Sequence, residues 1–163
     1  MDIALVRVDN RLVHGQILEA WVPYSKSSII VIVDDNVAGD LFRETVIRMA
    51  VPREVELIIS NVEDFANNYK YSRGQGKKKA IVLFSSIVDA LRAFQGGFVF
   101  DRLNIGNVCS EECLKQCSPS VMLNAEDVKA IETFLEEGVH IDVRCVPREK
   151  PIDIRKMITM IGA

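Results

Sequence analysis

The run Ile29-Ile30-Val31-Ile32-Val33-Asp34 is the stretch of sequence that decides the fold class. Its five consecutive β-branched apolar residues are typical of a strand that is buried on both faces. Three further short apolar runs stand about 25 residues apart along the chain, at Ile3–Val8, Val55–Ser60 and Ala80–Phe84. Short strands at this spacing, separated by helical patterns, indicate β-α-β units that build a parallel sheet.

Amphipathic stretches, in which apolar residues recur at helical spacing, separate these strands. The predicted helices are Gly15–Val22, Ala38–Ala50, Asn61–Tyr69, Ser86–Phe94 and Ala125–Glu137. We expect Pro23 and Pro52 to end the first two helices, because proline does not continue a helix. Asn124 is suited to cap the start of the last helix, and Gly138 is suited to terminate it.

Three later segments are also predicted strands: Arg102–Ile105, Ser120–Leu123 and Val139–Cys145. In the last of these, apolar and polar residues alternate, which is typical of an antiparallel strand near a sheet edge. The predicted fold class is therefore α/β. We expect an open, doubly wound, mostly parallel sheet of about seven strands, with helices on both faces and the last strands antiparallel.

Length and composition set the broad class of protein. The 163 residues predict a single domain over residues 1–163, and 48% hydrophobic with 26% charged residues is an ordinary globular composition. A net charge of −3 argues against a nucleic-acid partner, which would require an excess of basic residues. No apolar run approaches the ~20 residues of a membrane-spanning helix, and Met1–Ile3 does not open a signal peptide. We therefore expect a cytoplasmic protein.

Two patterns could be mistaken for functional motifs. Gly74–Lys77 resembles part of a phosphate-binding loop but precedes the strand Ala80–Phe84, whereas that motif follows a strand and opens a helix. Cys109, Cys113 and Cys117 would share one face of a helix, but their spacing is not that of a zinc site. We expect free thiols, with a metal or redox role as the alternative, and we expect no cofactor and no metal.

The loop after the first strand, residues 7–16 (RVDNRLVHGQ), carries the candidate chemistry. Ligands of open α/β sheets bind beyond the carboxyl ends of the strands, and this loop follows such an end. Arg11 and Arg7 can present forked guanidinium donors to phosphate oxygens. The two arginines indicate an anion site suited to a phosphoryl group.

The same loop holds a candidate nucleophile. Asp9 can keep one ring nitrogen of His14 protonated, so that the other nitrogen attacks. Gly15 allows close approach to the start of the predicted helix, where backbone amides favour an anion. The alternative is a structural histidine that caps the helix start, among solvated arginines.

The run Val8–Gln16, followed by Trp21, resembles the signature of the IIB component of the mannose/fructose/sorbose family of the bacterial phosphoenolpyruvate-dependent sugar phosphotransferase system. Further segments along almost the whole chain are similar to the family: Ile30–Asp35, Val37-Ala38, Phe42-Arg43, Ala50–Pro52, Leu83-Phe84, Leu103–Asn107 and Glu136–Val139.

The resemblance implies a protein-Nπ-phosphohistidine–sugar phosphotransferase. In this family a loop histidine, here His14, accepts a phosphoryl group from a phosphohistidine of the IIA component. It then passes the group to a sugar that enters through the membrane components IIC and IID. The resemblance further implies a homodimer that works in the cytoplasm against a membrane transporter.

Further site residues follow from the resemblance. The loop aspartate and arginine of the family fall on Asp9 and Arg11, and Gln16 lies in the same motif. Arg43 and Phe84 match positions that border the family's site.

Two positions depart from the family pattern. Many members have a second aspartate where this chain has Asn10, and a further glycine commonly follows Gly106, where this chain has Asn107. The alternative function is a regulatory or binding module of the same fold, which is phosphorylated or senses a partner without sugar transfer. The cysteine series would support that alternative. A phosphatase is disfavoured, because no acid for the leaving group and no water-activating residue can be named. The other histidine, His140, is predicted to lie on the surface.

Overall fold

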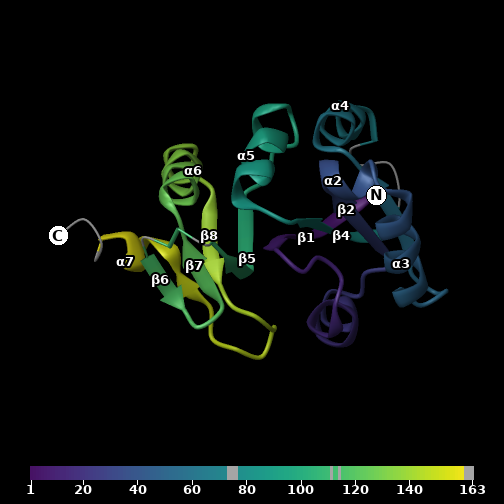
Figure 1. Ribbon diagram of the computed structural model, residues 1–163, viewed down its shortest axis with the longest axis horizontal. Coiled ribbons are helices and arrows are strands. Elements are labelled where there is room, and N and C mark those ends of the chain that lie inside the picture. Colours follow the sequence, from purple (N-terminus) through teal and green to yellow (C-terminus); the bar gives the residue numbers. More distant parts are fainter. Residues whose placement is uncertain (73–76, 111, 114, 160–163) are drawn as a thin grey trace.

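A nine-stranded sheet runs through the molecule, and helices cover both of its faces (Figure 1). The structure is a computed structural model and describes residues 1–72, 77–110, 112–113 and 115–159. The strands are β1 (Asp2–Asp9), β2 (Ile29–Val33), β3 (Glu56–Ser60), β4 (Lys79–Phe84), β5 (Arg102–Cys109), β6 (Lys115–Ser118), β7 (Val121–Leu123), β8 (His140–Val143) and β9 (Ile152–Asp153). All seven predicted strands are present, together with β6 and β9.

The sheet is mostly parallel, as predicted. Strands β3-β2-β4-β1-β5 lie side by side in that order, and each is parallel to its neighbours. Antiparallel pairing occurs between β6 and β7 and between β8 and β9. Strand β8, predicted within Val139–Cys145 to be antiparallel, is antiparallel to β9 as predicted but parallel to its other neighbour, β5. Its alternation reflects one buried face and one open face: Ile141 is buried and His140 is exposed, as predicted for His140.

The helices are η1 (Gln16–Trp21, a π-helical stretch), α1 (Val22–Ser25), α2 (Asp35–Ala38), α3 (Leu41–Ala50), α4 (Val62–Ser72), α5 (Ile87–Gln95), α6 (Ala125–Glu136) and α7 (Ile154–Thr159). Figure 1 shows α4, α5 and α6 on one side of the sheet and α3 on the other. Asn124 and Asp127 form a capping box at the start of α6, and Gly138 follows its end with φ +82°. These features confirm the predicted start and stop of that helix.

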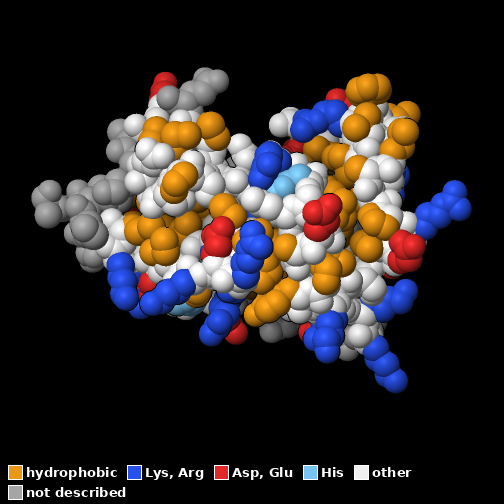
Figure 2. All heavy atoms as spheres, turned by 90° about the horizontal axis from the view of Figure 1, so that it is seen from below, with side chains coloured by type: hydrophobic (Ala, Val, Ile, Leu, Met, Phe, Trp, Pro, Cys, Tyr) orange, Lys and Arg blue, Asp and Glu red, His pale blue; other side chains and the backbone are white. Residues whose placement is uncertain are grey.

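Two helix predictions are corrected by the structure. Pro23 does not end the first helix but lies in the first turn of α1, where a missing amide hydrogen is tolerated. The predicted helix Ala38–Ala50 is two helices, because Asp40 starts α3 by accepting a bond from the Arg43 amide at 3.1 Å. The apolar face of α3 is also uncovered, with Leu41 79% and Met49 82% exposed. Figure 2 shows hydrophobic side chains gathered on that side of the molecule.

The two faces of β2 explain why its sequence is apolar throughout. Val31 and Val33 belong to the main core, which lies between the sheet and helices α4, α5 and α6. Ile30 and Ile32 belong to a second core on the opposite face, where they pack with Trp21 of η1. Each successive side chain therefore points into a different apolar layer.

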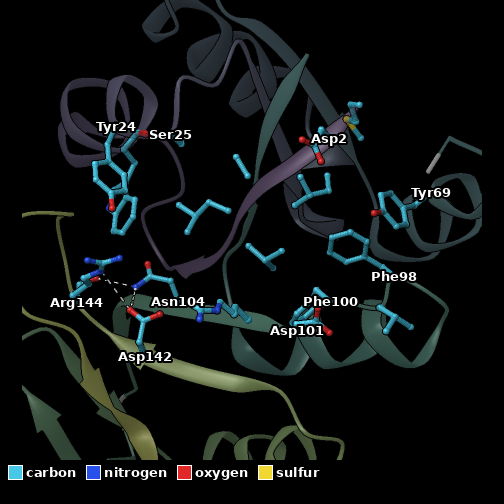
Figure 3. Close-up of a pocket in the computed structure, with 18 residues that line it drawn as sticks. Asp2, Tyr24, Ser25, Tyr69, Phe98, Phe100, Asp101, Asn104, Asp142 and Arg144 are labelled. Carbon is cyan, nitrogen blue, oxygen red and sulfur yellow. Dashed lines mark hydrogen bonds and ion pairs between the residues drawn. The ribbon is translucent and has the colours of Figure 1, made fainter. Parts of the chain in front are cut away.

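Strand β1 pairs with β5 only through its carboxyl-terminal residues, which lie opposite the middle of β5. Their register begins at Arg7 opposite Asn104, and a cavity of about 610 Å³ is lined by the preceding part of β1 and by residues 98–102 and Asn104. Figure 3 shows Asn104, Asp142 and Arg144 together at one end of this cavity, with Tyr69, Phe98 and Phe100 at the other. The β1–β5 junction therefore lies directly before the loop that carries the candidate chemistry.

Two of the three evenly spaced cysteines lie in strands. Cys109 ends β5 and Cys117 lies in β6, so the shared helical face that their spacing would allow does not form. None of the four cysteines forms a disulfide with another described residue. Of the rejected motif at 74–77, the first three residues lie outside the described ones. Within the described ranges, no helix has the length and apolar character that crossing a bilayer requires.

Candidate functional site

The loop between β1 and η1 is held by a tight turn with a buried leucine. Leu12 has φ 59°, and its amide donates to the carbonyl of Asp9 at 2.9 Å. Its side chain is buried in the second core. A left-handed conformation at leucine costs roughly 1–2 kcal/mol, which burial of the side chain offsets. A second bond, from the Asn10 amide to the Asn107 carbonyl at 2.9 Å, ties the loop to β5.

Asp9 is the centre of the site. One of its oxygens, Oδ2, accepts hydrogen bonds from Arg7 Nη2 (3.0 Å), His14 Nε2 (2.7 Å) and Asn107 Nδ2 (2.9 Å). The other, Oδ1, accepts from the Arg11 amide at 3.0 Å. Burial raises the pKa of Asp9, but the hydrogen bonds from His14 and Asn107 and the Arg7 charge outweigh it, so the pKa is lowered. Asp9 is therefore ionised at neutral pH.

Arg7 is completely buried and supports Asp9 from below the loop. Its guanidinium also donates to Asn104 Oδ1 at 2.7 Å, to the Arg144 carbonyl at 3.2 Å and to Gln16 Oε1 at 3.4 Å. Burial lowers the pKa of Arg7, opposed by the Asp9 charge, and a guanidinium stays protonated in proteins. Arg7 and Asp9 thus form a buried ion pair whose donors and acceptors are largely engaged inside the protein.

Two neighbours shape the space that Arg7 occupies. Gly106 is skipped in the β1–β5 register, and a Cβ there would lie 2.0 Å from Arg7 Nη2. Trp21 lies on another side of the guanidinium, with its ring centroid 5.4 Å from Arg7 Cζ and 5.1 Å from Arg144 Cζ. Its indole nitrogen donates to the Cys145 carbonyl at 2.8 Å. The tryptophan of the sequence motif is therefore a support for the buried arginine.

His14 is held by one ring nitrogen and is 14% exposed. An ionised carboxylate only accepts hydrogen bonds, so Nε2 must carry the proton that is shared with Asp9. In the neutral ring the lone pair then lies on Nδ1. The Gln16 amide points to Nδ1 over a long 3.4 Å. The arrangement can present Nδ1 as a nucleophile.

The outer part of the loop is open. Arg11 is exposed, and its guanidinium forms no ion pair with any described carboxylate. A Cβ on Gly15 would meet only Glu19 Oε2, at 3.9 Å. Beside Gly15 and Gln16 lies an open cavity of about 620 Å³, whose other wall is the segment 146–148. On the face in Figure 2, histidine and basic side chains lie together near a notch between two lobes.

The structure joins some of the predicted site residues and not others. Arg7, Asp9, His14 and Gln16 form one hydrogen-bonded network. Arg43 lies exposed on α3, and no described contact links its side chain to that network. Phe84 is completely buried in the main core, in register with Val8, so its side chain cannot touch a ligand.

Sequence reasoning missed the contribution of β5 and of the chain after β8. The side chains of Asn104 and Asn107 contact Arg7 and Asp9, and the carbonyl of Arg144 accepts from Arg7. The two asparagines lie in the segment Leu103–Asn107, which the family resemblance marked without a role. Among the described residues, no group of three His, Cys, Asp or Glu side chains could hold a metal ion.

Comparisons with known proteins agree with one another. Residues 3–162 match the model of the family described as the PTS system sorbose subfamily IIB component. The chain is 30% identical over 158 residues to the fructose-specific EIIB component of Bacillus subtilis, covering 97% of this chain and 96% of that protein. It is 33% identical over 157 residues to the sorbose-specific EIIB component of Lacticaseibacillus casei, covering 94% and 93%.

Solved structures and a longer relative extend these matches. The IIBSor domain of the sorbose permease from Klebsiella pneumoniae superposes with a TM-score of 0.89 at 29% identity, over 98% of each chain. The mannose-specific EIIAB component of Escherichia coli is 27% identical over 161 residues, which are 99% of this chain and 50% of that protein. The chain therefore belongs to the sorbose subfamily of IIB components of the sugar phosphotransferase system.

Proposed function

We propose that this IIB component carries a phosphoryl group on His14. The group comes from a phosphohistidine of a IIA component and goes to a sugar during transport by the membrane components IIC and IID. The observation that carries the proposal is the 2.7 Å bond between His14 Nε2 and the buried, ionised Asp9. This bond leaves Nδ1 as the nitrogen with a lone pair, on a ring that reaches the surface.

The first transfer makes one bond and breaks one bond. The bond between the donor histidine and phosphorus breaks as the bond between His14 Nδ1 and phosphorus forms. The proton on Nε2 stays on the ring and remains hydrogen-bonded to Asp9. In a loose transition state negative charge spreads over the phosphoryl oxygens, and the exposed Arg11 can neutralise it. Arg7 is fully buried and acts only by keeping Asp9 ionised and in place.

The second transfer has a sugar hydroxyl as acceptor. The bond from His14 Nδ1 to phosphorus breaks as the bond from the sugar oxygen to phosphorus forms, and the hydroxyl proton is released. The names of relatives as fructose-specific and sorbose-specific components support a sugar acceptor. The EIIAB name of the mannose-specific relative, which this chain matches over half its length, supports a IIA donor.

The location and assembly are part of the proposal. The chain would act in the cytoplasm, bound peripherally to its transporter, and would form a homodimer. Sedimentation of the purified chain tests the dimer: a mass of one chain across micromolar concentrations would contradict it.

The test of the first transfer is labelling from radioactive phosphoenolpyruvate, with the general proteins of the system and a IIA component. We expect acid-labile phosphate on the wild type and on the control variant His140→Ala, and none on His14→Ala. His140 is the matched control because it is the other histidine of the chain and is exposed on β8. Label that survives in His14→Ala would overturn the proposal.

The second transfer is tested in a separate experiment. Membrane vesicles that contain IIC and IID are added with sugar to the labelled protein. Loss of label from the protein with formation of sugar phosphate is expected. Label that stays on the protein in these vesicles would instead support a regulatory or binding module, which is phosphorylated without transferring to sugar.

A further inference from the structure

Asn107 lies where β5 meets the start of the loop. The β1–β5 register skips Gly106, and this shift places Asn107 directly opposite Asp9. The backbone carbonyl of Asn107 accepts from the Asn10 amide at 2.9 Å, so the residue is fixed independently of its side chain. Its side chain therefore points at the site from a rigid strand.

The side-chain amide of Asn107 contacts the carboxylate that holds the His14 ring and the side chain of Gln16. Its Nδ2 donates to Asp9 Oδ2 at 2.9 Å, and this is the same oxygen that binds His14 Nε2 at 2.7 Å. Nδ2 also donates to the side-chain Oε1 of Gln16 at 3.1 Å, whereas His14 Nδ1 faces the backbone amide of the same residue at 3.4 Å. Asn107 thus acts on the group that holds Nε2 of the ring without touching the ring itself.

Sharing one oxygen between donors has a chemical consequence. Each donor to Asp9 Oδ2 disperses part of its negative charge, so the other donors are held less strongly. If fewer hydrogen-bond donors shared Oδ2 of Asp9 with His14, the carboxylate would stabilise the doubly protonated ring more strongly. A doubly protonated ring has no lone pair and cannot attack phosphorus.

We propose that Asn107 is a positioning residue for phosphoryl transfer: it shares Asp9 Oδ2 with His14, limits the hold of the carboxylate on the ring, and so keeps the imidazole neutral and nucleophilic. This inference rests on the proposed function of His14.

Other charged groups lie around the ring. Arg7 acts from β1 through Asp9, and Arg11 lies in the loop. Glu19 of η1 and Arg148 line the cavity beside Gly15 and Gln16. Of these groups and Asp9, only Asp9 is hydrogen-bonded to the His14 side chain. Removal of Asn107 therefore acts on the ring mainly through Asp9.

The experiment measures the rate of phosphoryl transfer from IIA in Asn107→Gly between pH 6 and 8.5. At pH 6.5 we expect a rate roughly fivefold below that of the wild type, the change that a one-unit shift in the ring titration produces. The two rates should converge toward pH 8.5, because less of the ring is protonated as pH rises. Asn107→Asp removes the side-chain NH₂ donor, keeps the shape of the side chain and adds a negative charge. It should therefore shift the pH dependence of the transfer rate further toward high pH than Asn107→Gly does.

The outcomes separate positioning from general damage. Asn67→Ala is the control, because Asn67 is an exposed amide on α4, on the far side of the main core, and should match the wild type at every pH. A rate of Asn107→Gly that is equal to the wild type at all pH values would overturn the inference. A rate that is lowered by the same factor at all pH values would also overturn it.

A separate readout keeps the inference distinct from the proposed function. If the wild type takes no label, the proposed function fails, and the ring titration of His14 is then followed by NMR in the unphosphorylated proteins. A midpoint that moves to higher pH in Asn107→Gly and further in Asn107→Asp supports the effect of Asn107 on the ring. An unmoved midpoint in both variants overturns it.

Discussion

Two arginines four residues apart have opposite environments. Arg7 ends up beneath the loop, fully buried, with its guanidinium bonded to Asp9, Asn104, Gln16 and a backbone carbonyl. Arg11 lies on the outside of the loop, exposed and without an ion pair to any described carboxylate. The sequence predicts that both arginines donate hydrogen bonds to phosphate oxygens, but only Arg11 is exposed to a ligand from solvent.

The difference divides the site into two layers. The inner layer is defined as Arg7, Asp9, Asn104 and Asn107, polar groups that are hydrogen-bonded to one another and are buried except for the half-buried Asn107. The outer layer, defined as Arg11, His14 and Gly15, lies on the open side of the loop, where we propose that the partners approach. The inner layer should therefore govern stability and the state of the ring, and the outer layer should govern transfer.

The largest expected effect is on the inner layer. Arg7→Met removes one partner of a buried ion pair and leaves Asp9 buried with a net charge, which costs about 3–5 kcal/mol of unfolding free energy. Denaturant unfolding measures the change. Arg11→Met is the matched control and should change stability by less than about 0.5 kcal/mol. Equal effects of the two variants would break the division into layers.

A smaller loss of stability is expected from Gly106→Ala. The added Cβ would lie 2.1 Å from Arg7 Cζ, so the guanidinium or the β1–β5 junction must move. Overpacking of this kind costs about 1–3 kcal/mol, measured by urea unfolding. Gly15→Ala is the control: its nearest neighbour would be 3.9 Å away and its φ is −52°, so its stability should stay near that of the wild type. If Gly106→Ala has the same unfolding free energy as the wild type, the guanidinium of Arg7 is not confined by Gly106.

The outer layer is tested by Arg11→Ala. We expect transfer from IIA to fall by roughly tenfold, which corresponds to about 1.4 kcal/mol of transition-state stabilisation. The unfolding free energy should stay within about 0.5 kcal/mol of the wild type. Rapid-quench labelling together with urea unfolding measures both quantities. A variant that loses stability but not rate would reverse the roles assigned to Arg7 and Arg11.

The smallest expected effect is the loss of folding stability at acidic pH. The pKa of Asp9 is lower in the folded chain than its ordinary value of 3.8, so the unfolded chain binds the proton first as pH falls. The stability that Asp9 contributes is fully present above that value and is lost as pH falls through the folded pKa. Wild-type stability should thus decline more steeply below about pH 4 than that of Asp9→Asn. Parallel declines in the two proteins would contradict the buried ion pair.

Much of the fold was readable in the sequence. The strands β2 and β4 were recognisable because both of their faces are buried, and α6 was recognisable from the cap at Asn124 and the stop at Gly138. Strand direction in β8 was not recognisable, because alternation reports which face is buried and not which neighbour pairs. The break at Asp40 and the uncovered face of α3 depend on tertiary packing, which local spacing does not encode.

The site was predicted in part for a similar reason. Asp9, Arg11 and His14 are close in sequence, so one loop sufficed to find them. The burial of Arg7 depends on Gly106 and Asn104, nearly a hundred residues away, which reach it only through the pairing of β1 with β5. The conformation of Leu12 also escaped prediction, because a left-handed leucine is stable only where its side chain is buried.

The central claim is that the inner layer holds His14 by Nε2 and leaves Nδ1 to carry phosphorus. The most direct measurement is NMR of the phosphorylated protein with ¹⁵N-labelled histidine, which identifies the ring nitrogen bonded to phosphorus. We predict a single phosphohistidine, with phosphorus on Nδ1 of His14 and the proton retained on Nε2. Phosphorus on Nε2 of His14, or on any other residue, would contradict the account.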